Sequence, residues 1–157
     1  MRRVVVSVVL ALSLVGFASA ASTSVAVVKV AYNAKLHTKI LVNGAGMTLY
    51  MYTADYKNVS GCVDDAAYHC IRAWPALVTT GAPKAAAGAK ASLLATAKRQ
   101  DGRTQVTYGG HLLYTWVGAR GLGLPPRDRK PGDVNGQGVI SAWWVLSPTG
   151  KPIKKMP

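Results

Sequence analysis

Trp74-Pro-Ala-Leu-Val-Thr-Thr-Gly-Ala-Pro83 recurs further along the chain as Trp143-Trp-Val-Leu-Ser-Pro-Thr-Gly-Lys-Pro152, and the two stretches share the pattern W-x-x-L-x-x-T-G-x-P. A second match lies upstream of each copy, where Gly46-Met-Thr-Leu-Tyr-Met-Tyr52 corresponds to Gly110-His-Leu-Leu-Tyr-Thr-Trp116. The two matches occur in the same order, 64 and 69 residues apart. This arrangement predicts that one structural unit is used twice, with different insertions.

The repeated residues are first of all predicted core residues. Aromatic and aliphatic side chains at matching positions of two units are explained most simply by packing, which assigns Trp74, Leu77, Trp143 and Leu146 to the core. Neighbouring residues of a strand face opposite ways. Trp144, beside Trp143, is therefore predicted to leave the core and is a candidate ligand contact.

Dense turn signals and scarce helical periodicity predict an all-β, mostly antiparallel domain with long loops. Glycine-containing turns at 43–44, 101–102 and 109–110 join neighbouring strands into hairpins. The predicted strands span 38–42, 47–52, 93–98, 104–108, 112–117 and 138–146. Residues 21–37 are expected to be an N-terminal extension or an edge strand. A single domain then covers 38–157, with repeat one at about 38–91 and repeat two at about 92–157.

The first twenty residues have the pattern of a cleaved signal peptide. Arg2 and Arg3 precede an apolar run from Val4 to Phe17, and Ala18-Ser-Ala20 is a small-residue cleavage site. The residue that follows is Ala21, not Cys, so we expect no lipid anchor. No other apolar segment reaches spanning length. The predicted location is periplasmic or extracellular.

The charge is strongly positive. The chain has 19 Lys and Arg against 6 Asp and no Glu, a formal net charge of +13. Removing the leader takes away two arginines and leaves 17 against 6, or +11. Such a charge favours anionic envelope polymers, or an envelope protein, as partner, whereas nothing beyond the charge supports nucleic acid. Within the long 118–138 loop, the predicted contacts are Arg127, Arg129 and Lys130.

Cys62 and Cys70 are expected to form a disulfide that closes a short loop, because an even cysteine count in an exported protein favours pairing. A metal site is the alternative, with His69, Asp64 and Asp65 as weak candidate ligands. The eight-residue spacing matches no common zinc pattern.

Several motifs together resemble the bacterial secreted-repeat lipoproteins, a family of undetermined function. Tyr50, Tyr52 and Asp55 fit the family's Y-x-[FWY]-x-x-D motif. The cysteine loop before Trp74-Pro75, Asp101-Gly102 before the 104–108 strand, and Gly132-Asp-Val-Asn-Gly-Gln-Gly138 fit as well. In the second copy, Tyr114 and Trp116 are followed by Ala119 where the motif has Asp. The resemblance implies a bacterial envelope protein and no particular reaction.

No catalytic constellation is found. Asp64 and Asp65 are adjacent, and Ser60 and Ser92 lie outside any nucleophile-elbow context. We therefore expect a non-catalytic envelope binding or scaffolding module with no cofactor. Two alternatives stay open, a metal- or haem-linked periplasmic accessory protein using dispersed histidines, and a hydrolase with unrecognised Asp chemistry.

Overall fold

The computed structural model describes residues 24–64, 69–119 and 121–157, so the predicted signal peptide lies outside it. The prediction of a mostly antiparallel β fold is confirmed. The strands are β1 (Val27–Asn33), β2 (Thr38–Asn43), β3 (Tyr50–Tyr52), β4 (Lys84–Ala85), β5 (Leu94–Lys98), β6 (Thr104–Tyr108), β7 (His111–Leu112) and β8 (Trp143–Val145). In the described ranges, the helical turns are α1 (Cys70–Ala73), η1 (Ala91–Leu93) and η2 (Val139–Ser141). Within the described ranges, no helix combines the length and the hydrophobicity needed to cross a membrane.

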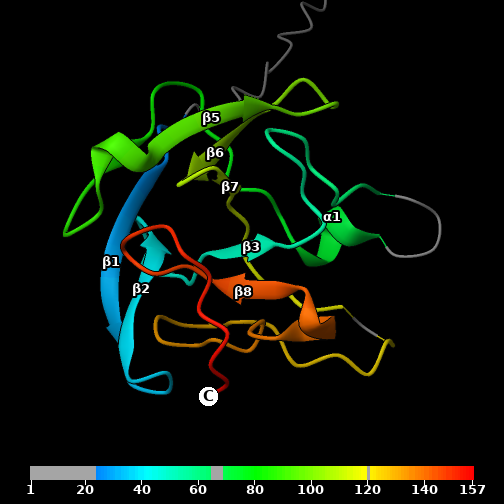
Figure 1. Cartoon of the computed structure of the whole chain (residues 1–157). Helices are drawn as coiled ribbons and strands as arrows, with labels where there is room; N and C mark the ends of the chain where they lie inside the picture. The colour runs from blue at the N-terminus through cyan, green and yellow to red at the C-terminus, as the bar shows by residue number, and fades with distance from the viewer. Residues whose placement is uncertain (1–23, 65–68, 120) are drawn as a thin grey trace, which may run out of the picture.

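Three small sheets build the domain (Figure 1). The sheet of order β5-β6-β7 lies above the antiparallel pair β3–β8 in this view, and strands β1 and β2 of the sheet of order β2-β1-β4 lie to its left. The expectation of an edge strand at 21–37 is wrong, because β1 is the middle strand of its sheet, antiparallel to β2 and parallel to β4. Val28 of β1 is fully buried. The domain therefore begins well before residue 38.

The two copies of the tyrosine motif meet at the centre. The amide of Tyr50 donates to the carbonyl of Tyr114, and the amide of Tyr114 donates back to the carbonyl of Tyr50, both at 2.9 Å. Each W-x-x-L segment then bonds to the hairpin of the opposite copy. Leu41 N–H donates to Leu146 O at 3.0 Å, and Val106 N–H donates to Leu77 O at 2.8 Å. Residues far apart in the sequence are thus linked by matching hydrogen bonds.

Apolar clusters cover both faces of the β3–β8 pair. Trp143 belongs to one cluster and Trp144 to the other. The prediction that Trp144 leaves the core is wrong, since only 9% of the residue is exposed. The alternation of facing directions is real, but a strand with a core on each face has no solvent side.

The strand predicted at 138–146 is shorter than expected. Residues Val139–Ser141 form a helical turn, and strand geometry begins only at Trp143. Ile140 and Ser141 have φ values of 46° and 56°, in the left-handed region that a β-branched residue rarely adopts. This tight turn interrupts what the sequence pattern suggested was a continuous strand.

Candidate functional site

A column of four aromatic rings forms the centre of the domain. Trp143 is stacked on Trp74 at a centroid distance of 3.8 Å and an angle of 3°, and on Tyr52 at 4.2 Å and 11°. Trp74 and Tyr52 are both too close to Trp143 to lie on the same face of its ring, so they cover opposite faces. Trp116 packs on Trp74 at 4.3 Å with a 38° tilt. The order along the column is Tyr52, Trp143, Trp74, Trp116.

The column has equivalent neighbours at its two halves. Tyr50 meets Trp74 edge-on at 5.4 Å and 76°, and Tyr114 meets Trp143 edge-on at 5.2 Å and 89°. Stacked and edge-to-face pairs are both favourable arrangements for aromatic rings. Trp74 and Trp143 are 3% and 1% exposed, as their predicted core role requires. Leu146 is fully buried, whereas Leu77 is only half-buried.

Each motif tyrosine binds the carboxylate that follows the other tyrosine. Tyr50 Oη donates to Asp128 Oδ2 at 2.7 Å, and Tyr114 Oη donates to Asp55 Oδ1 at 3.0 Å. A backbone amide adds a bond to each carboxylate, with Asn135 N–H donating to Asp128 Oδ1 at 2.8 Å and Gly61 N–H to Asp55 Oδ1 at 2.9 Å. The other oxygen of Asp55, Oδ2, is buried without a hydrogen-bond partner among the described residues. These hydrogen bonds attach the segment that carries Asp55 to Tyr114 and the segment that carries Asp128 to Tyr50.

Asp128 is the paired carboxylate that sequence reasoning missed. Asp55 lies five positions after Tyr50, whereas Asp128 lies fourteen positions after Tyr114, so comparison at fixed spacing found Ala119 instead. The sequence feature that could have indicated Asp128 is its position as the single acid among three bases in the 127–130 run. Asp128 is only 7% exposed although its three neighbours in that run are exposed.

Burial controls the ionisation of these pairs. Burial raises the pKa of Asp55 to about 6, against the lowering effect of its bonds from Gly61 and Tyr114. Burial also raises the pKa of Asp128. The pKa values of Tyr50 and Tyr114 are raised by burial and by the adjacent carboxylates. Both phenols therefore stay protonated at neutral pH and act as hydrogen-bond donors.

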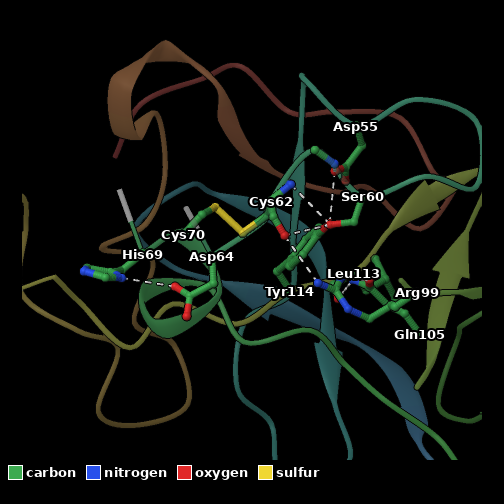
Figure 2. Close-up of a disulfide and its surroundings, with 11 residues drawn as sticks. Asp55, Ser60, Cys62, Asp64, His69, Cys70, Arg99, Gln105, Leu113 and Tyr114 are labelled. Atoms are coloured by element: carbon green, nitrogen blue, oxygen red, sulfur yellow. Dashed lines mark hydrogen bonds and ion pairs between the residues drawn. A yellow bond between two sulfur atoms is a disulfide. The ribbon is translucent and has the colours of Figure 1, made fainter. Parts of the chain in front are cut away.

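The disulfide and the Asp55 pair belong to one polar network, shown in Figure 2. Cys62 and Cys70 are bonded, with Cα atoms 5.3 Å apart, which confirms the predicted bridge. Ser60 Oγ lies 2.8 Å from Tyr114 Oη. The buried guanidinium of Arg99 donates to the carbonyl of Cys62 at 3.3 Å and to the side chain of Gln105.

The Asp55→Asn variant is expected to lose a specific part of the pH dependence of stability. A pKa raised above the unfolded value means that the folded state holds the proton more tightly, so the free energy of unfolding falls as pH rises from about 4 to 6. The fall due to this group is about 3 kcal/mol, and the neutral asparagine lacks it. Urea unfolding at several pH values measures the difference between the two proteins. Parallel stability curves would contradict the assignment.

The candidate metal ligands are only partly brought together. His69 Nδ1 lies 3.3 Å from Asp64 Oδ1, while Arg72 Nε lies 3.5 Å from the other oxygen of the same carboxylate. Asp65 lies outside the described residues. In the part of the chain that the structure describes, no three His, Cys, Asp or Glu side chains gather as a metal site would require.

The predicted ligand contacts Arg127, Arg129 and Lys130 are exposed on the long loop. Asp128 points inward between them. Asp133 turns the chain by accepting from the amides of Arg129 at 2.9 Å and Lys130 at 3.2 Å. The loop thus presents three cations to solvent around an inward-facing acid.

Further contacts fix this loop to the domain. Trp116 Nε1 donates to Pro126 O at 2.8 Å, and Asn33 Nδ2 donates to Gly132 O at 3.0 Å. Lys35 forms an ion pair with Asp133 at 3.6 Å. The loop is therefore anchored to the aromatic column through Pro126 and to the turn after β1 through Gly132 and Asp133.

Comparison with known protein families gives a match that covers part of the chain. No curated protein and no solved structure matches this chain. The matching segment contains Tyr114, Asp128 and Trp143, which supply one member of each paired contact described above. Residues 95–147 match a family described as a secreted repeat of unknown function, and this match supports the resemblance found in the sequence.

Proposed function

We propose that the protein is an exported, non-catalytic binding module that contacts anionic polymers of the cell envelope through Arg127, Arg129 and Lys130. The observation that carries the proposal is the imbalance of exposed charge. Anionic chains with repeated phosphate or carboxylate groups are the partners that such a surface attracts.

The acids of the described part are already engaged. Asp55 and Asp128 face inward to the tyrosines, and Asp64, Asp101 and Asp133 each have a basic partner. The ion pairs found among the described residues use His69 and the four bases Lys35, Arg72, Arg99 and Arg103. The cations of the 127–130 run are outside these pairs, so their charge is available to a ligand.

The fixed position of the loop adds to the binding argument. A loop that is held before binding loses less conformational entropy when the ligand arrives. The side chains of Tyr50, Trp116 and Asn33 lie outside the loop, and each donates a hydrogen bond to it. Arg127, Arg129 and Lys130 therefore lie on a loop whose position is fixed by hydrogen bonds before a ligand binds.

The scaffold under this loop is proposed to consist of two equivalent units. Four sets of paired contacts support this interpretation: the tyrosine backbone bonds, the bonds between leucine segments and hairpins, the edge-on rings and the tyrosine–carboxylate bonds. Each unit contributes one strand motif, one tryptophan and one carboxylate. The insertions then differ freely, one carrying the disulfide and the other the basic loop.

Replacing Arg127, Arg129 and Lys130 together with glutamine is expected to weaken binding to inorganic polyphosphate about tenfold or more at low salt. Counterion release by three contacts also predicts that wild-type affinity falls roughly 20-fold between about 50 and 200 mM salt, and that the variant has a shallower salt dependence. Fluorescence anisotropy with labelled polyphosphate measures both quantities.

The matched control removes the same charge elsewhere. Lys84, Lys90 and Lys98 are exposed and lie on or beside β4 and β5. Changing these three to glutamine should alter affinity by about twofold or less, the effect of net charge alone. Equal weakening in both triple variants would show that the loop is no specific contact.

A further inference from the structure

A hollow of about 390 Å³ is lined by β1 and by the end of the basic loop. Pro131 and Gly132, which directly follow Lys130, line it from the loop. Residues 29–33 line it from β1, and Asn33 Nδ2 links the two sides by donating to Gly132 O at 3.0 Å. The volume is in the range of small-molecule sites, about 300 to 1,000 Å³. The hollow therefore lies next to the loop that carries the proposed contacts to an anionic polymer.

Tyr32 gives this hollow an exposed aromatic residue. It is 64% exposed and lines the hollow, whereas Trp74 and Trp143 of the central column are buried. The face of an aromatic ring is electron-rich and attracts electropositive groups such as C–H. A sugar ring presents C–H groups on its flat faces, so it can stack on Tyr32. A polyphosphate chain has no C–H group to place there.

Strand β1 has an open edge at Tyr32. On the side of β4, Val28 O accepts from Ala86 N–H at 2.9 Å. Val30 N–H donates to Ala87 O on the same side, also at 2.9 Å. Alternate residues of a paired strand direct their N–H and C=O groups to the same side, so those of Tyr32 point past the last of these partners. Neither group has a hydrogen-bond partner within the described ranges. A sugar hydroxyl both donates and accepts, so sugar hydroxyls can satisfy both groups.

Cations lie near the exposed ring, and no acid lines the hollow among the residues that the structure describes. Lys29 lines the hollow. Lys39 is exposed and is the direct cross-strand partner of Tyr32, and such side chains are neighbours on one face of the sheet. Lys130 directly precedes the loop residues of the lining. A sugar ring on Tyr32 that carries an acid group therefore has positive charge beside it.

We propose that the anionic polymer bound by the basic loop is a polysaccharide, one of whose acidic sugar rings lies on Tyr32 in this hollow. This inference rests on the proposed function and names the chemical class of its partner. Stacking uses the exposed ring, the sugar hydroxyls bind the open main-chain groups, and the acid group meets the cations. Single-stranded nucleic acid is the less favoured polyanion, because its binding uses successive aromatic side chains. Tyr32 is the only aromatic residue that lines the hollow in the part of the chain that the structure describes.

The test compares two polyanions with the oxidised mature protein. Polygalacturonate has an acidic sugar at every unit, and inorganic polyphosphate has no sugar. Fluorescence anisotropy is expected to show that Tyr32→Ala binds labelled polygalacturonate about tenfold more weakly, because the stacking contact is lost. Its affinity for polyphosphate should stay within about twofold of the wild type, since no charge is removed. Tyr32→Phe keeps the ring and should bind polygalacturonate within about twofold of the wild type.

Tyr56→Ala is the matched control. Tyr56 is 81% exposed and does not line the hollow. Substitutions of exposed side chains usually leave the fold intact, so both alanine variants should remain folded. Tyr56→Ala should leave the affinity for both polyanions within about twofold of the wild type. Equal weakening of polygalacturonate binding by Tyr32→Ala and Tyr56→Ala would reject the location.

Further results would overturn the proposal. Polygalacturonate that fails to bind where polyphosphate binds, or that binds Tyr32→Ala as well as the wild type, would reject the sugar contact. Equal weakening of both polyanions by Tyr32→Ala would reject the selectivity of the ring for a sugar. A larger loss for a labelled single-stranded thymidine oligonucleotide than for polygalacturonate would assign the surface to nucleic acid.

The loop variant separates this inference from the proposed function. If glutamine at Arg127, Arg129 and Lys130 leaves polyphosphate binding unchanged, the proposed function fails. If those substitutions weaken the binding of both polyanions while Tyr32→Ala changes neither, only the polysaccharide inference fails.

Discussion

The Trp143→Ala variant is expected to lose about 4 kcal/mol of unfolding free energy. Trp143 is 1% exposed and contacts Tyr52, Trp74 and Tyr114. Alanine removes all three contacts and leaves a cavity that the surrounding strands cannot close. Urea denaturation followed by near-ultraviolet circular dichroism measures the loss.

A double-mutant cycle with Trp74→Ala separates stacking from general burial. The two tryptophans lie on each other at 3.8 Å, so the second substitution should cost less in the background of the first, by about 1 kcal/mol or more. The single Trp74→Ala change should be about as costly as Trp143→Ala, because the two rings have equivalent neighbours. Strictly additive effects would contradict a continuous column.

The Asp128→Ala variant is expected to lose about 3 kcal/mol, although Asp128 belongs to a charged surface run. Its carboxylate accepts from Tyr50 Oη and from the amide of Asn135. Removing the carboxylate leaves the buried hydroxyl of Tyr50 without its acceptor and breaks the hydrogen bond that holds the basic loop to β3. Thermal or urea unfolding measures the change, and proteolytic susceptibility of the loop should increase.

The partner of this bond supplies the control. Once Asp128 is alanine, the additional change Tyr50→Phe should cost about 1 kcal/mol less than it does in the wild type, since the shared bond is already absent. Asp55→Ala should also be destabilising, because it removes the acceptor of Tyr114 and Gly61. A stability loss below about 1 kcal/mol for Asp128→Ala would show that the pairing is incidental.

Local sequence signals predicted the β fold and the disulfide well. The alternation of side chains along a short strand and the residues of a tight turn are both determined by neighbouring residues. The β5–β6 hairpin was therefore predicted correctly from the local sequence. Pairing of Cys62 with Cys70 followed from their number and predicted compartment. These features need no knowledge of distant contacts.

Features that depend on distant contacts were not predicted. Trp144 was placed outside because one strand face was assumed to be solvated, but a second apolar cluster covers that face. Residues 21–37 are expected from the sequence to be an extension or an edge strand, whereas β1 is a middle strand because it also pairs with β4, which is only two residues long and lies in a loop-like segment. Asp128 was missed because an insertion changes its spacing from Tyr114 while its spatial role is kept.

Co-sedimentation of the oxidised mature protein with purified cell envelopes, across a series of salt concentrations, tests the proposed function most directly. Binding at low salt is expected to fall steadily as salt increases, and to be clearly reduced when Arg127, Arg129 and Lys130 are changed to glutamine. Absence of binding at low salt, or binding that is indifferent to both salt and the loop substitutions, would contradict the proposed function.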